Sequence, residues 1–372
     1  MNQSIYILSR PLSNILDEGS KNLVYYLCLN TNHSLSVVTE NSFELKLSPS
    51  VTTYKLDFEI DKENVENSRS LKVKIHLIKR LFQARKINTL HCFFTITPLN
   101  AFILLIVRFF YRVRVVVTMP AFPIAFENNF LIKRVMRKAE CVVVMTNDTS
   151  KLIKRFTDKV QVIPPLVDDN KYFPMAESLI LELKKKLGIT AEFTVIIPGE
   201  YGRLDMNENS VKIVKETNKR HPEVLFIFSF RLKTGQDKII ENKIKKRLIG
   251  CSVLFLNTIN NYHEYASIAD ISVFPANSMD GKFDLPLALV ELMCSGVPVF
   301  HSDIPKLNEL YKTQVDQFAL RGNEVYVEKI SQCFTQREAF KRYKEVTLRE
   351  AVRFSPEKVT KQYDLIYNGA NV

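Results

Sequence analysis

The most informative stretch of the sequence is FDLPLALVELMCSGVPVFHSD, residues 283–303. Pro286 suits the start of a helix because its missing N–H would be unpaired there anyway, and Gly296 with Pro298 suits the end of one. Glu291 then lies one turn into the predicted helix. A carboxylate in this place can accept hydrogen bonds from two neighbouring hydroxyl groups of a ligand, since it has two oxygens. Simple capping of the helix is the alternative role of this glutamate.

The elements that must position Glu291 alternate between strand and helix along the whole chain. Short apolar runs rich in β-branched residues predict strands buried in parallel sheets, and the segments between them have helical patterns. In the first half, the predicted strands are Ile5–Leu8, Leu35–Val38, Thr89–Phe94, Arg114–Thr118, Cys141–Met145 and Val160–Ile163, and the predicted helices are Lys21–Asn30, Leu71–Lys86, Leu99–Tyr111 and Ile132–Lys138.

The proline-rich segment Ile163–Pro174 interrupts this alternation and reads as a linker, because proline fits neither a helix interior nor a central strand. The alternation then restarts, so we expect two α/β halves with a binding site in the cleft between them, where strand ends meet. The second half has predicted strands Thr194–Ile197, Leu225–Ser229, Val253–Leu256, Ile271–Phe274 and Pro298–Phe300, predicted helices Ser178–Leu187, Ser210–Arg220 and Leu287–Cys294, and a long helical tail from about Gln336 to Tyr367.

Length and composition agree with two globular domains. The chain has 372 residues, of which 46% are hydrophobic and 25% charged. No apolar run approaches the roughly 20 residues that span a bilayer, and the first residues do not resemble a secretion signal. The six cysteines are scattered without metal-binding spacing, which favours reduced, buried thiols in a cytoplasmic protein.

The positive charge is concentrated in one part of the first half. Residues 71–160 contain 17 Lys and Arg against 4 Asp and Glu, which accounts for essentially all of the net charge of +12. The predicted helix Leu71–Lys86 has Ile75 and Ile78 on an apolar stripe. A basic amphipathic helix of this kind can lie on anionic lipid, or it can simply bury its stripe on the sheet. We predict membrane-surface contacts for Lys72, Lys79, Arg80 and Lys86. Nucleic acid is not an expected partner, because no recognition signature accompanies the charge.

Several motifs resemble those of the large family of retaining glycosyltransferases with the GT-B fold, the type that includes lipopolysaccharide, capsule and mannosyltransferases. Residues 283–303 resemble the donor-sugar motif. The resemblance continues, in the family's order, in CVVVMTND at residues 141–148, VIPPLVDDNKYFP at 162–174, YHEYASIADISVFP at 262–275 and RFSPEKVTKQYDLIY at 353–367. It therefore runs from about residue 141 to the C-terminal end.

The resemblance implies roles for residues of the donor-sugar motif. Glu291 matches the second of the family's two glutamates, which accepts hydrogen bonds from the nucleotide ribose. Phe283 stands where the family has the first glutamate, which faces the donor sugar. The neighbouring Asp284 is our candidate replacement in catalysis, with Asp280 as the other carboxylate nearby. Leu285 and Pro286, between the two motif positions, are further candidate donor-binding residues.

The family also neutralises the diphosphate with an Arg and a Lys after the first strand of its second domain. Arg203 is the candidate here for catalysis, and Arg231 and Lys233 at the next strand end are candidates for donor binding. Gly19 follows the first strand, where the family has a glycine loop near the donor phosphate. His91, at a predicted strand end, is a candidate on the acceptor side, with a role in the core as the alternative. The acidic pair Asp168–Asp169 lies in the linker, and the family's chemistry needs no metal cofactor.

The resemblance implies two Rossmann-like domains, residues 1–165 with the C-terminal helix of about 353–372, and residues 166–352. The expected function is retaining transfer of a sugar from UDP or GDP to a glycan or lipid-linked acceptor in polysaccharide biosynthesis. The expected location is the inner face of the plasma membrane, as a peripheral protein. The alternative is a non-catalytic subunit of the same shape that binds or scaffolds within a glycan-assembly complex.

Overall fold

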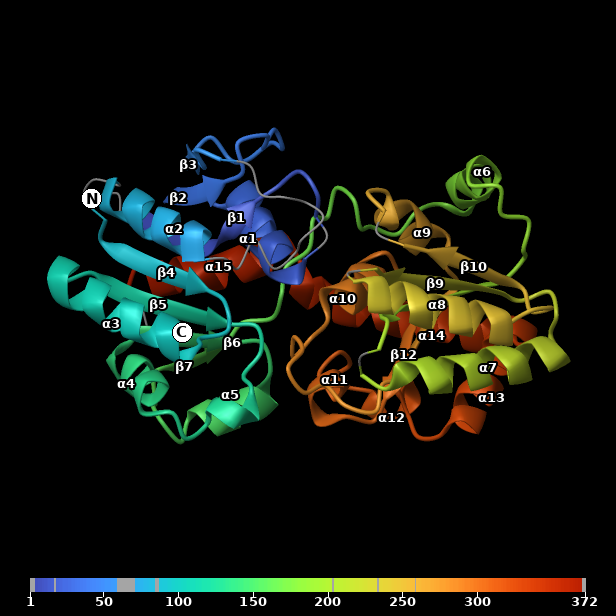
Figure 1. The fold of residues 1–372 in the computed structure, drawn as a ribbon. Coiled ribbons are helices and arrows are strands. Elements are labelled where there is room, and N and C mark those ends of the chain that lie inside the picture. The colour runs from blue at the N-terminus through green and yellow to red at the C-terminus, as the bar shows by residue number, and fades with distance from the viewer. Residues whose placement is uncertain are drawn as a thin grey trace. The chain divides into compact units, whose positions relative to one another are not determined.

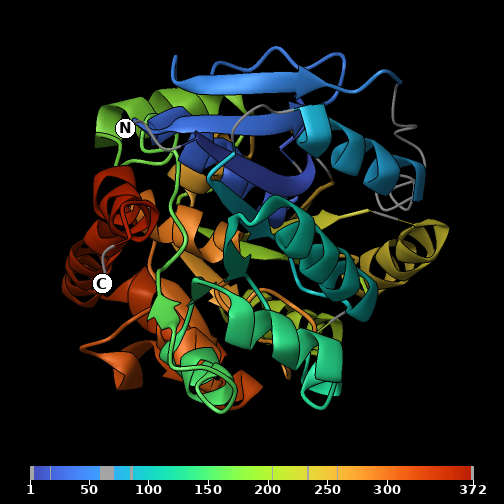
Figure 2. The ribbon, with the colours of Figure 1, turned by 90° about the vertical axis from the view of Figure 1, so that its left-hand side faces the viewer.

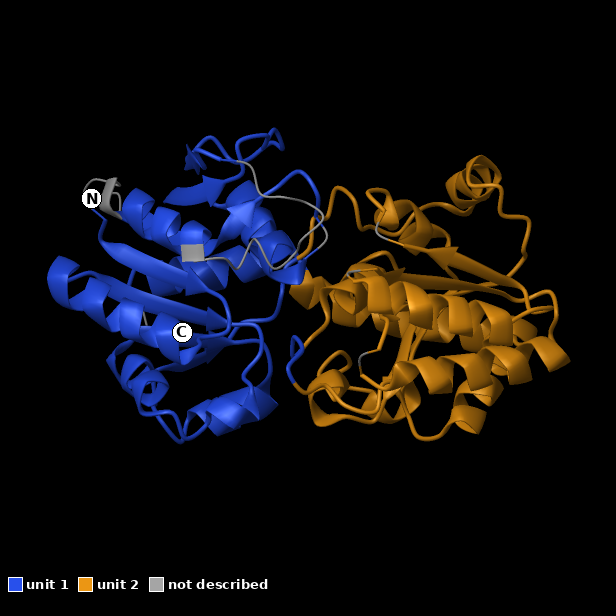
Figure 3. Cartoon of the chain, in the orientation of Figure 1, with its two compact units in different colours: residues 1–166, 281–284, 355–372 blue, residues 167–280, 285–354 orange. Residues whose placement is uncertain are grey.

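The computed structural model describes residues 4–16, 18–58, 71–83, 87–202, 204–232, 234–257 and 259–369. Contacts divide the chain into two compact units, each built around its own sheet (Figures 1 and 3). Unit 1 comprises Met1–Leu166, Gly281–Asp284 and Ser355–Val372, and unit 2 comprises Val167–Asp280 and Leu285–Phe354. The short segment 281–284 belongs to unit 1 by its contacts, although we expected it within the second domain.

Unit 1 contains a parallel sheet with the strand order β3-β2-β1-β4-β5-β6-β7. The central strands are buried on both faces, as their apolar runs predict. The strands are β1 Ser4–Leu12, β2 Ser34–Thr39, β3 Val51–Lys55, β4 Thr89–Phe93, β5 Arg114–Met119, β6 Cys141–Val144 and β7 Val160–Val162.

Helices cover both faces of the unit 1 sheet (Figure 2). On one face, the apolar sides of α2, α3 and α4 pack in a common core with alternate strand residues such as Leu90, Val117 and Val142. On the other face, the C-terminal helix α15 packs beside α1. The helices are α1 Gly19–Asn30, α2 Leu71–Gln83, α3 Pro98–Tyr111, η2 Ile124–Phe126, α4 Phe130–Lys138, α5 Asn147–Ile153 and α15 Pro356–Tyr367.

Unit 2 contains a second parallel sheet, with the order β10-β9-β8-β11-β12-β13. Its strands are β8 Thr194–Glu200, β9 Leu225–Arg231, β10 Val253–Leu256, β11 Ile271–Phe274, β12 Val299–Ser302 and β13 Ala319–Leu320. Its helices are α6 Glu177–Lys186, α7 Met206–Arg220, α8 Gly235–Arg247, α9 Tyr262–Ile268, α10 Leu287–Cys294, α11 Pro305–Asn308, α12 Val315–Phe318, α13 Asn323–Thr335, α14 Arg337–Ala351 and η3 Val352–Phe354.

Asp270, in the stretch that resembles the family's A-D-I motif, joins two strands of this sheet. Its carboxylate accepts hydrogen bonds from the backbone N–H of Thr194 at 2.7 Å and from the Thr194 hydroxyl at 2.9 Å. Burial raises the pKa of Asp270, while the ammonium group of Lys184, 3.6 Å away, opposes the rise. This aspartate therefore fixes β11 against β8 from within the fold.

The structure confirms the alternating α/β pattern with two parallel sheets and corrects three details. The C-terminal tail is two helices, because Pro356 begins α15 after the 3-10 turn η3. The edge strands β3 and β13 were not predicted, since neither has a run of apolar residues. In α2, Val73, Leu77 and Leu81 form the buried stripe, whereas Ile75 is 58% exposed.

Candidate functional site

The candidate site in unit 2 is built on α10, which carries Glu291 near its middle. The helix has the predicted bounds, and Pro286 precedes it as the N-cap and supplies no side-chain cap. Glu291 is only 4% exposed, although the residues around it on the helix are apolar. A buried carboxylate on an otherwise apolar helix is unusual, which makes Glu291 a candidate ligand-binding residue.

The negative charge of Glu291 raises the pKa values of two other groups in unit 2. Burial raises the pKa of the Tyr262 phenol well above its usual value, and the negative charge of Glu291 raises it further. Burial likewise raises the pKa of the Cys294 thiol to about 12, with added contributions from Glu291 and Asp169. Tyr262 begins α9, which packs against α10, so its phenol lies within electrostatic range of the Glu291 carboxylate.

The C-terminal ends of β8 and β9 carry a charged pair. Arg231 ends β9 opposite Glu200 of β8, and its guanidinium donates a hydrogen bond to the Glu200 carboxylate. This ion pair holds the arginine in place and offsets part of its charge, so Arg231 is a weaker anion site than its sequence position predicts. The other two basic candidates, Arg203 and Lys233, lie outside the residues that the structure describes.

The end of β10 contributes a polar group that the sequence analysis did not single out. Asn257 follows this strand directly, and its side-chain oxygen is buried with no hydrogen-bond partner among the described residues. Burial without a partner is costly for an amide oxygen, which makes Asn257 a candidate ligand-binding residue if its side chain turns toward the ligand. The sequence could have indicated this residue, because Asn257 is a polar residue directly after the apolar run of a predicted parallel strand.

The two residues between the motif positions differ in exposure. Leu285 is 1% exposed and packs in the interior, which leaves only its backbone for contact with a donor. Pro286 is partly exposed next to the uncapped N-terminus of α10, whose backbone N–H groups attract negative charge.

Asp284, the candidate replacement for the first glutamate, is a structural residue of unit 1. It is fully buried, its backbone N–H donates to the Pro120 carbonyl at 2.8 Å, and its carboxylate accepts a hydrogen bond from Thr146 at 3.3 Å. Thr146 is itself the N-cap of α5. The predicted catalytic role of Asp284 is therefore at odds with the structure, because a ligand cannot reach a fully buried carboxylate.

Gly19 and Phe283 meet inside unit 1. Gly19 begins α1, and a Cβ atom built on it would lie 2.7 Å from the Phe283 ring. The glycine therefore makes room for the phenylalanine that stands in place of the family's first glutamate. This contact gives Gly19 a packing reason for being a glycine, whereas its donor-binding role stays a prediction.

His91 is a core residue, which is one of the two roles that the sequence left open, and not an acceptor-side residue. It lies in β4 with no exposed surface, and its ring nitrogens are 2.7 Å from the Tyr367 hydroxyl and 2.8 Å from the Thr118 hydroxyl. Burial lowers its pKa to about 3, so the ring is neutral at physiological pH. The histidine ties the C-terminal helix α15 to the sheet and offers no free ring atom to an acceptor.

The basic residues of α2 are not equivalent. Lys72 and Lys79 are exposed, and the Lys72 ammonium lies 4.3 Å from the centre of the Phe58 ring. Arg80 instead forms an ion pair with Asp57 and donates to the Lys55 carbonyl at 3.0 Å, so much of its charge is already used. Lys86 lies outside the described residues. Thus α2 presents less free positive charge than the sequence predicts.

The acidic pair in the linker is part of a turn. Asp168 is buried, and its carboxylate accepts a hydrogen bond from the backbone N–H of Asn170 at 3.2 Å. Within the described parts of the chain, no group of three or more His, Cys, Asp or Glu residues is placed to hold a metal ion. Among the same residues, no helix is both long and apolar enough to cross a bilayer.

Comparisons with known proteins agree with this geometry. The model of the family "Glycosyl transferases group 1" matches residues 181–349, which lie in unit 2 except for residues 281–284. No curated protein sequence matches the chain. Among solved structures, a sucrose-phosphate synthase from Thermosynechococcus elongatus has a TM-score of 0.76 at 14% identity, with 98% of each chain covered.

Two further structures are similar over nearly the whole chain. Anabaena HepE in complex with UDP and glucose has a TM-score of 0.70 at 16% identity, covering 97% of this chain and 98% of HepE. A glycosyltransferase from Rickettsia africae has a TM-score of 0.69 at 12% identity, covering 99% of this chain and 98% of the other. At these identities the likeness establishes the fold.

The two parallel-sheet units define the GT-B fold, as the sequence predicts. Unit 2 carries the group 1 glycosyltransferase domain, and the buried Glu291 lies within it. Residues 181–349 thus resemble a group 1 glycosyltransferase domain, within a chain that has the GT-B fold.

Proposed function

We propose that this enzyme transfers a sugar from a UDP-sugar, with retention of anomeric configuration, to a glycan or lipid-linked acceptor. The match of the group 1 family model to residues 181–349 supports donor binding in unit 2. UDP is favoured over GDP because UDP is the nucleotide in the similar structures of HepE, and of a pneumococcal O-GlcNAc transferase that covers 79% of this chain. GDP remains the competing donor nucleotide for the test below.

The observation that carries the proposal is the buried carboxylate of Glu291. In the proposed complex its two oxygens accept hydrogen bonds from the two ribose hydroxyls, a geometry that suits a vicinal diol. The Tyr262 phenol stays protonated at physiological pH because its pKa is raised, and we assign it as a further hydrogen-bond donor to the nucleotide. The Asn257 side-chain oxygen supplies a further acceptor at the end of the neighbouring strand β10.

The diphosphate of the donor is assigned to the N-terminus of α10. Pro286 leaves the first N–H groups of this helix without a side-chain cap, and these groups with the helix dipole favour an anion. Arg231, held by Glu200, is the described basic residue proposed to assist, and Arg203 and Lys233 are proposed with it from the sequence. No resident metal or other cofactor is part of the proposal.

In the proposed reaction the bond between the sugar's anomeric carbon and the phosphate oxygen breaks. The acceptor oxygen attacks the same face, and its proton passes to the departing phosphate oxygen. The diphosphate gains charge as this bond breaks, so groups that stabilise it accelerate the step without a separate protein base. The acceptor is assigned to unit 1 at the inner membrane face, because residues 71–160 carry the excess of positive charge.

A nucleotide panel tests the donor assignment. UDP, GDP and their glucose, N-acetylglucosamine and mannose derivatives would be compared by thermal unfolding. A ligand at 100 times its Kd adds about 2.7 kcal/mol to the free energy of unfolding. Stabilisation by UDP compounds, with a product of unchanged anomeric configuration by NMR, is expected. Stabilisation by GDP compounds alone, or an inverted product, would overturn the proposal.

One observation favours the second candidate, a non-catalytic binding or scaffold subunit. The position of the family's first glutamate is taken by Phe283, whose ring packs on Gly19 within unit 1, and the adjacent Asp284 is buried. A scaffold of this kind would bind UDP yet show no turnover of any UDP-sugar, either with acceptors or with water. Turnover by the wild-type protein would exclude it.

A further inference from the structure

The outer face of α3 is apolar although it faces solvent. Ala101, Leu104 and Val107 line the buried side of this helix. On the opposite side Phe109 is 78% exposed and Phe110 is 73% exposed. A soluble surface helix normally presents polar residues on its outer side, so an outer stripe of this composition points to something that covers it.

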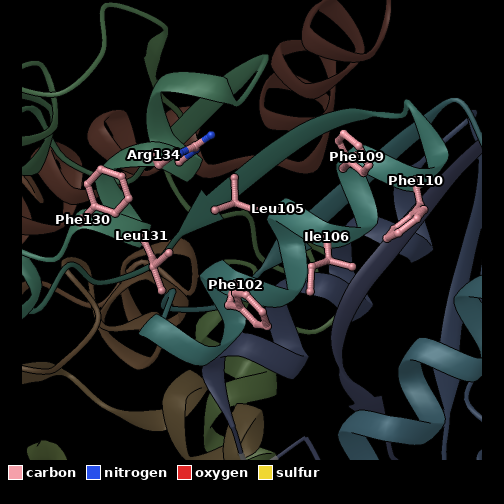
Figure 4. A pocket seen from close by; sticks show the side chains of 8 residues that line it. All are labelled: Phe102, Leu105, Ile106, Phe109, Phe110, Phe130, Leu131 and Arg134. Atoms are coloured by element: carbon pink, nitrogen blue, oxygen red, sulfur yellow. The ribbon is translucent and has the colours of Figure 1, made fainter.

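The stripe continues onto the neighbouring helix α4. Phe102, Ile106, Phe109 and Phe110 of α3 and Phe130 and Leu131 of α4 line one shallow hollow of about 260 Å³ (Figure 4). Phe130 at the start of α4 is 66% exposed. We call these six residues the aromatic face. Four of the six are phenylalanines, and they come from two helices of unit 1 that pack against each other.

Positive charge surrounds the aromatic face. Residues 98–138 contain seven Lys and Arg and a single acidic residue, Glu127. Arg134 also lines the hollow, with its guanidinium 6.0 Å from the centre of the Phe130 ring. The exposed Arg137 and Lys138 follow in the last turn of α4. An apolar centre with a positively charged rim is complementary to a lipid bilayer, which has an apolar interior and can have anionic headgroups.

We propose that the aromatic face of α3 and α4 docks onto an anionic lipid bilayer, with its phenylalanines among the headgroups and upper acyl chains. The inference rests on the proposed function only for the lipid-linked acceptor that such docking would bring within reach. It moves the membrane contact from α2, where Arg80 is paired with Asp57, to α3 and α4. A second copy of the chain is a poorer occupant, because a symmetric pair would bring two positive rims together.

The test is co-sedimentation with vesicles of phosphatidylcholine alone or with added phosphatidylglycerol. The double variant Phe109→Ser with Phe110→Ser removes the two most exposed phenylalanines of the aromatic face. Its matched control changes Leu179 and Leu181, which are 47% and 61% exposed on α6 of unit 2, to serine. A second pair, Lys72→Gln with Lys79→Gln, removes the exposed charge of α2.

The proposal expects the wild type to bind anionic vesicles and to remain partly bound at high salt, where surface charge is screened within about 3 Å. The phenylalanine double variant should bind at least tenfold more weakly, while the α6 and α2 variants bind like the wild type. Equal binding of wild type and phenylalanine double variant, or no binding of the wild type, overturns the proposal. So does a wild-type dimer in solution that the phenylalanine variant converts to monomers, since the occupant would then be a second copy.

UDP stabilisation measured on the same samples keeps the two proposals apart. Because the changed side chains lie in unit 1 and are mostly exposed, the phenylalanine variant should unfold at the wild-type temperature and respond to UDP as the wild type does. Vesicle binding without UDP stabilisation would refute the donor assignment and leave the docking face intact. UDP stabilisation without vesicle binding would do the reverse.

Discussion

Asp284 and Glu291 are both buried carboxylates, and they stand seven residues apart in the chain. Asp284 belongs to unit 1, where a threonine hydroxyl donates to it and no surface is exposed. Glu291 belongs to unit 2, on a helix of the group 1 domain, where its charge acts on Tyr262 and Cys294. Asp284 thus accepts a hydrogen bond within unit 1, and Glu291 raises the pKa values of two groups in unit 2.

The difference shows that burial alone does not identify a ligand-binding carboxylate. What distinguishes the two is the surroundings: Asp284 anchors a short segment by hydrogen bonds at both its backbone and its side chain. These hydrogen bonds anchor segment 281–284 to the rest of unit 1, and α10 begins three residues after this segment. Stability should therefore depend on Asp284, and nucleotide binding on Glu291.

The largest effect is expected for Asp284→Ala. The substitution leaves Thr146 without its acceptor and empties a buried polar position, which should lower the free energy of unfolding by about 3 kcal/mol. Denaturant unfolding measures the loss. The matched control is Asp280→Ala, four residues earlier and exposed, which should change stability little. If the Asp284→Ala protein is as stable as the wild type but has lost turnover, Asp284 acts in catalysis and not in stability.

The counterpart is Glu291→Ala, which should leave the unfolding midpoint near that of the wild type. UDP affinity should fall by about 2 kcal/mol, or roughly thirtyfold, because two hydrogen bonds to a charged acceptor are lost. Titration calorimetry measures the affinity. Glu345→Ala, at an exposed position of α14, serves as the control and should bind UDP normally. Wild-type affinity in the Glu291 variant would remove this residue from the donor site.

The fold was largely predictable because its strands are buried on both faces. Runs such as Val115–Val117 and Val142–Val144 are apolar throughout, and composition alone then marks a parallel sheet. The helix α8 was missed for the opposite reason: only Glu241 and Ile244 are buried in it, so it has no apolar stripe to recognise. The stripe of α2 was misplaced because apolar residues occur on more than one side of that helix.

The site was predictable only where a motif carried it. Glu291 follows from its motif, whereas the two partners of His91 lie 27 and 276 residues away, and no local pattern reveals them. The pairing of Arg231 with Glu200 depends on the register of β8 and β9, which the sequence does not specify. Likewise, the assignment of 281–284 to unit 1 depends on contacts with Pro120 and Thr146.

Acid unfolding extends the comparison to one buried histidine in each unit. Burial lowers the pKa of His91 to about 3 and that of His301 in β12 to about 4. Each ring is neutral when folded, whereas the unfolded chain takes up a proton below its ordinary pKa of about 6.5. Stability is therefore full above pH 6.5 and falls by about 1.4 kcal/mol per pH unit for each histidine below it, until the folded pKa is reached.

Urea unfolding at a series of pH values tests this dependence. His91→Gln and His301→Gln should each be less stable than the wild type at pH 7 yet lose less stability between pH 6.5 and 5. Carboxylates contribute to all three profiles equally, so the difference between profiles isolates the histidine. Parallel profiles for wild type and variants would show that these rings do not carry the acid response.

The smallest effect concerns the contact between Phe283 of segment 281–284 and Gly19, the first residue of α1. Alanine at position 19 would suit the helix better than glycine by up to about 1 kcal/mol, but its Cβ would press on the Phe283 ring at 2.7 Å. Gly19→Ala should therefore destabilise the wild type by about 1 kcal/mol and become neutral or stabilising when combined with Phe283→Ala. Gly235→Ala is the matched control, because this glycine also begins a helix and its added Cβ would meet nothing within 4 Å. If the two substitutions change the free energy of unfolding additively, the Phe283 ring does not restrict position 19. Segment 281–284 would then be held by Asp284 alone.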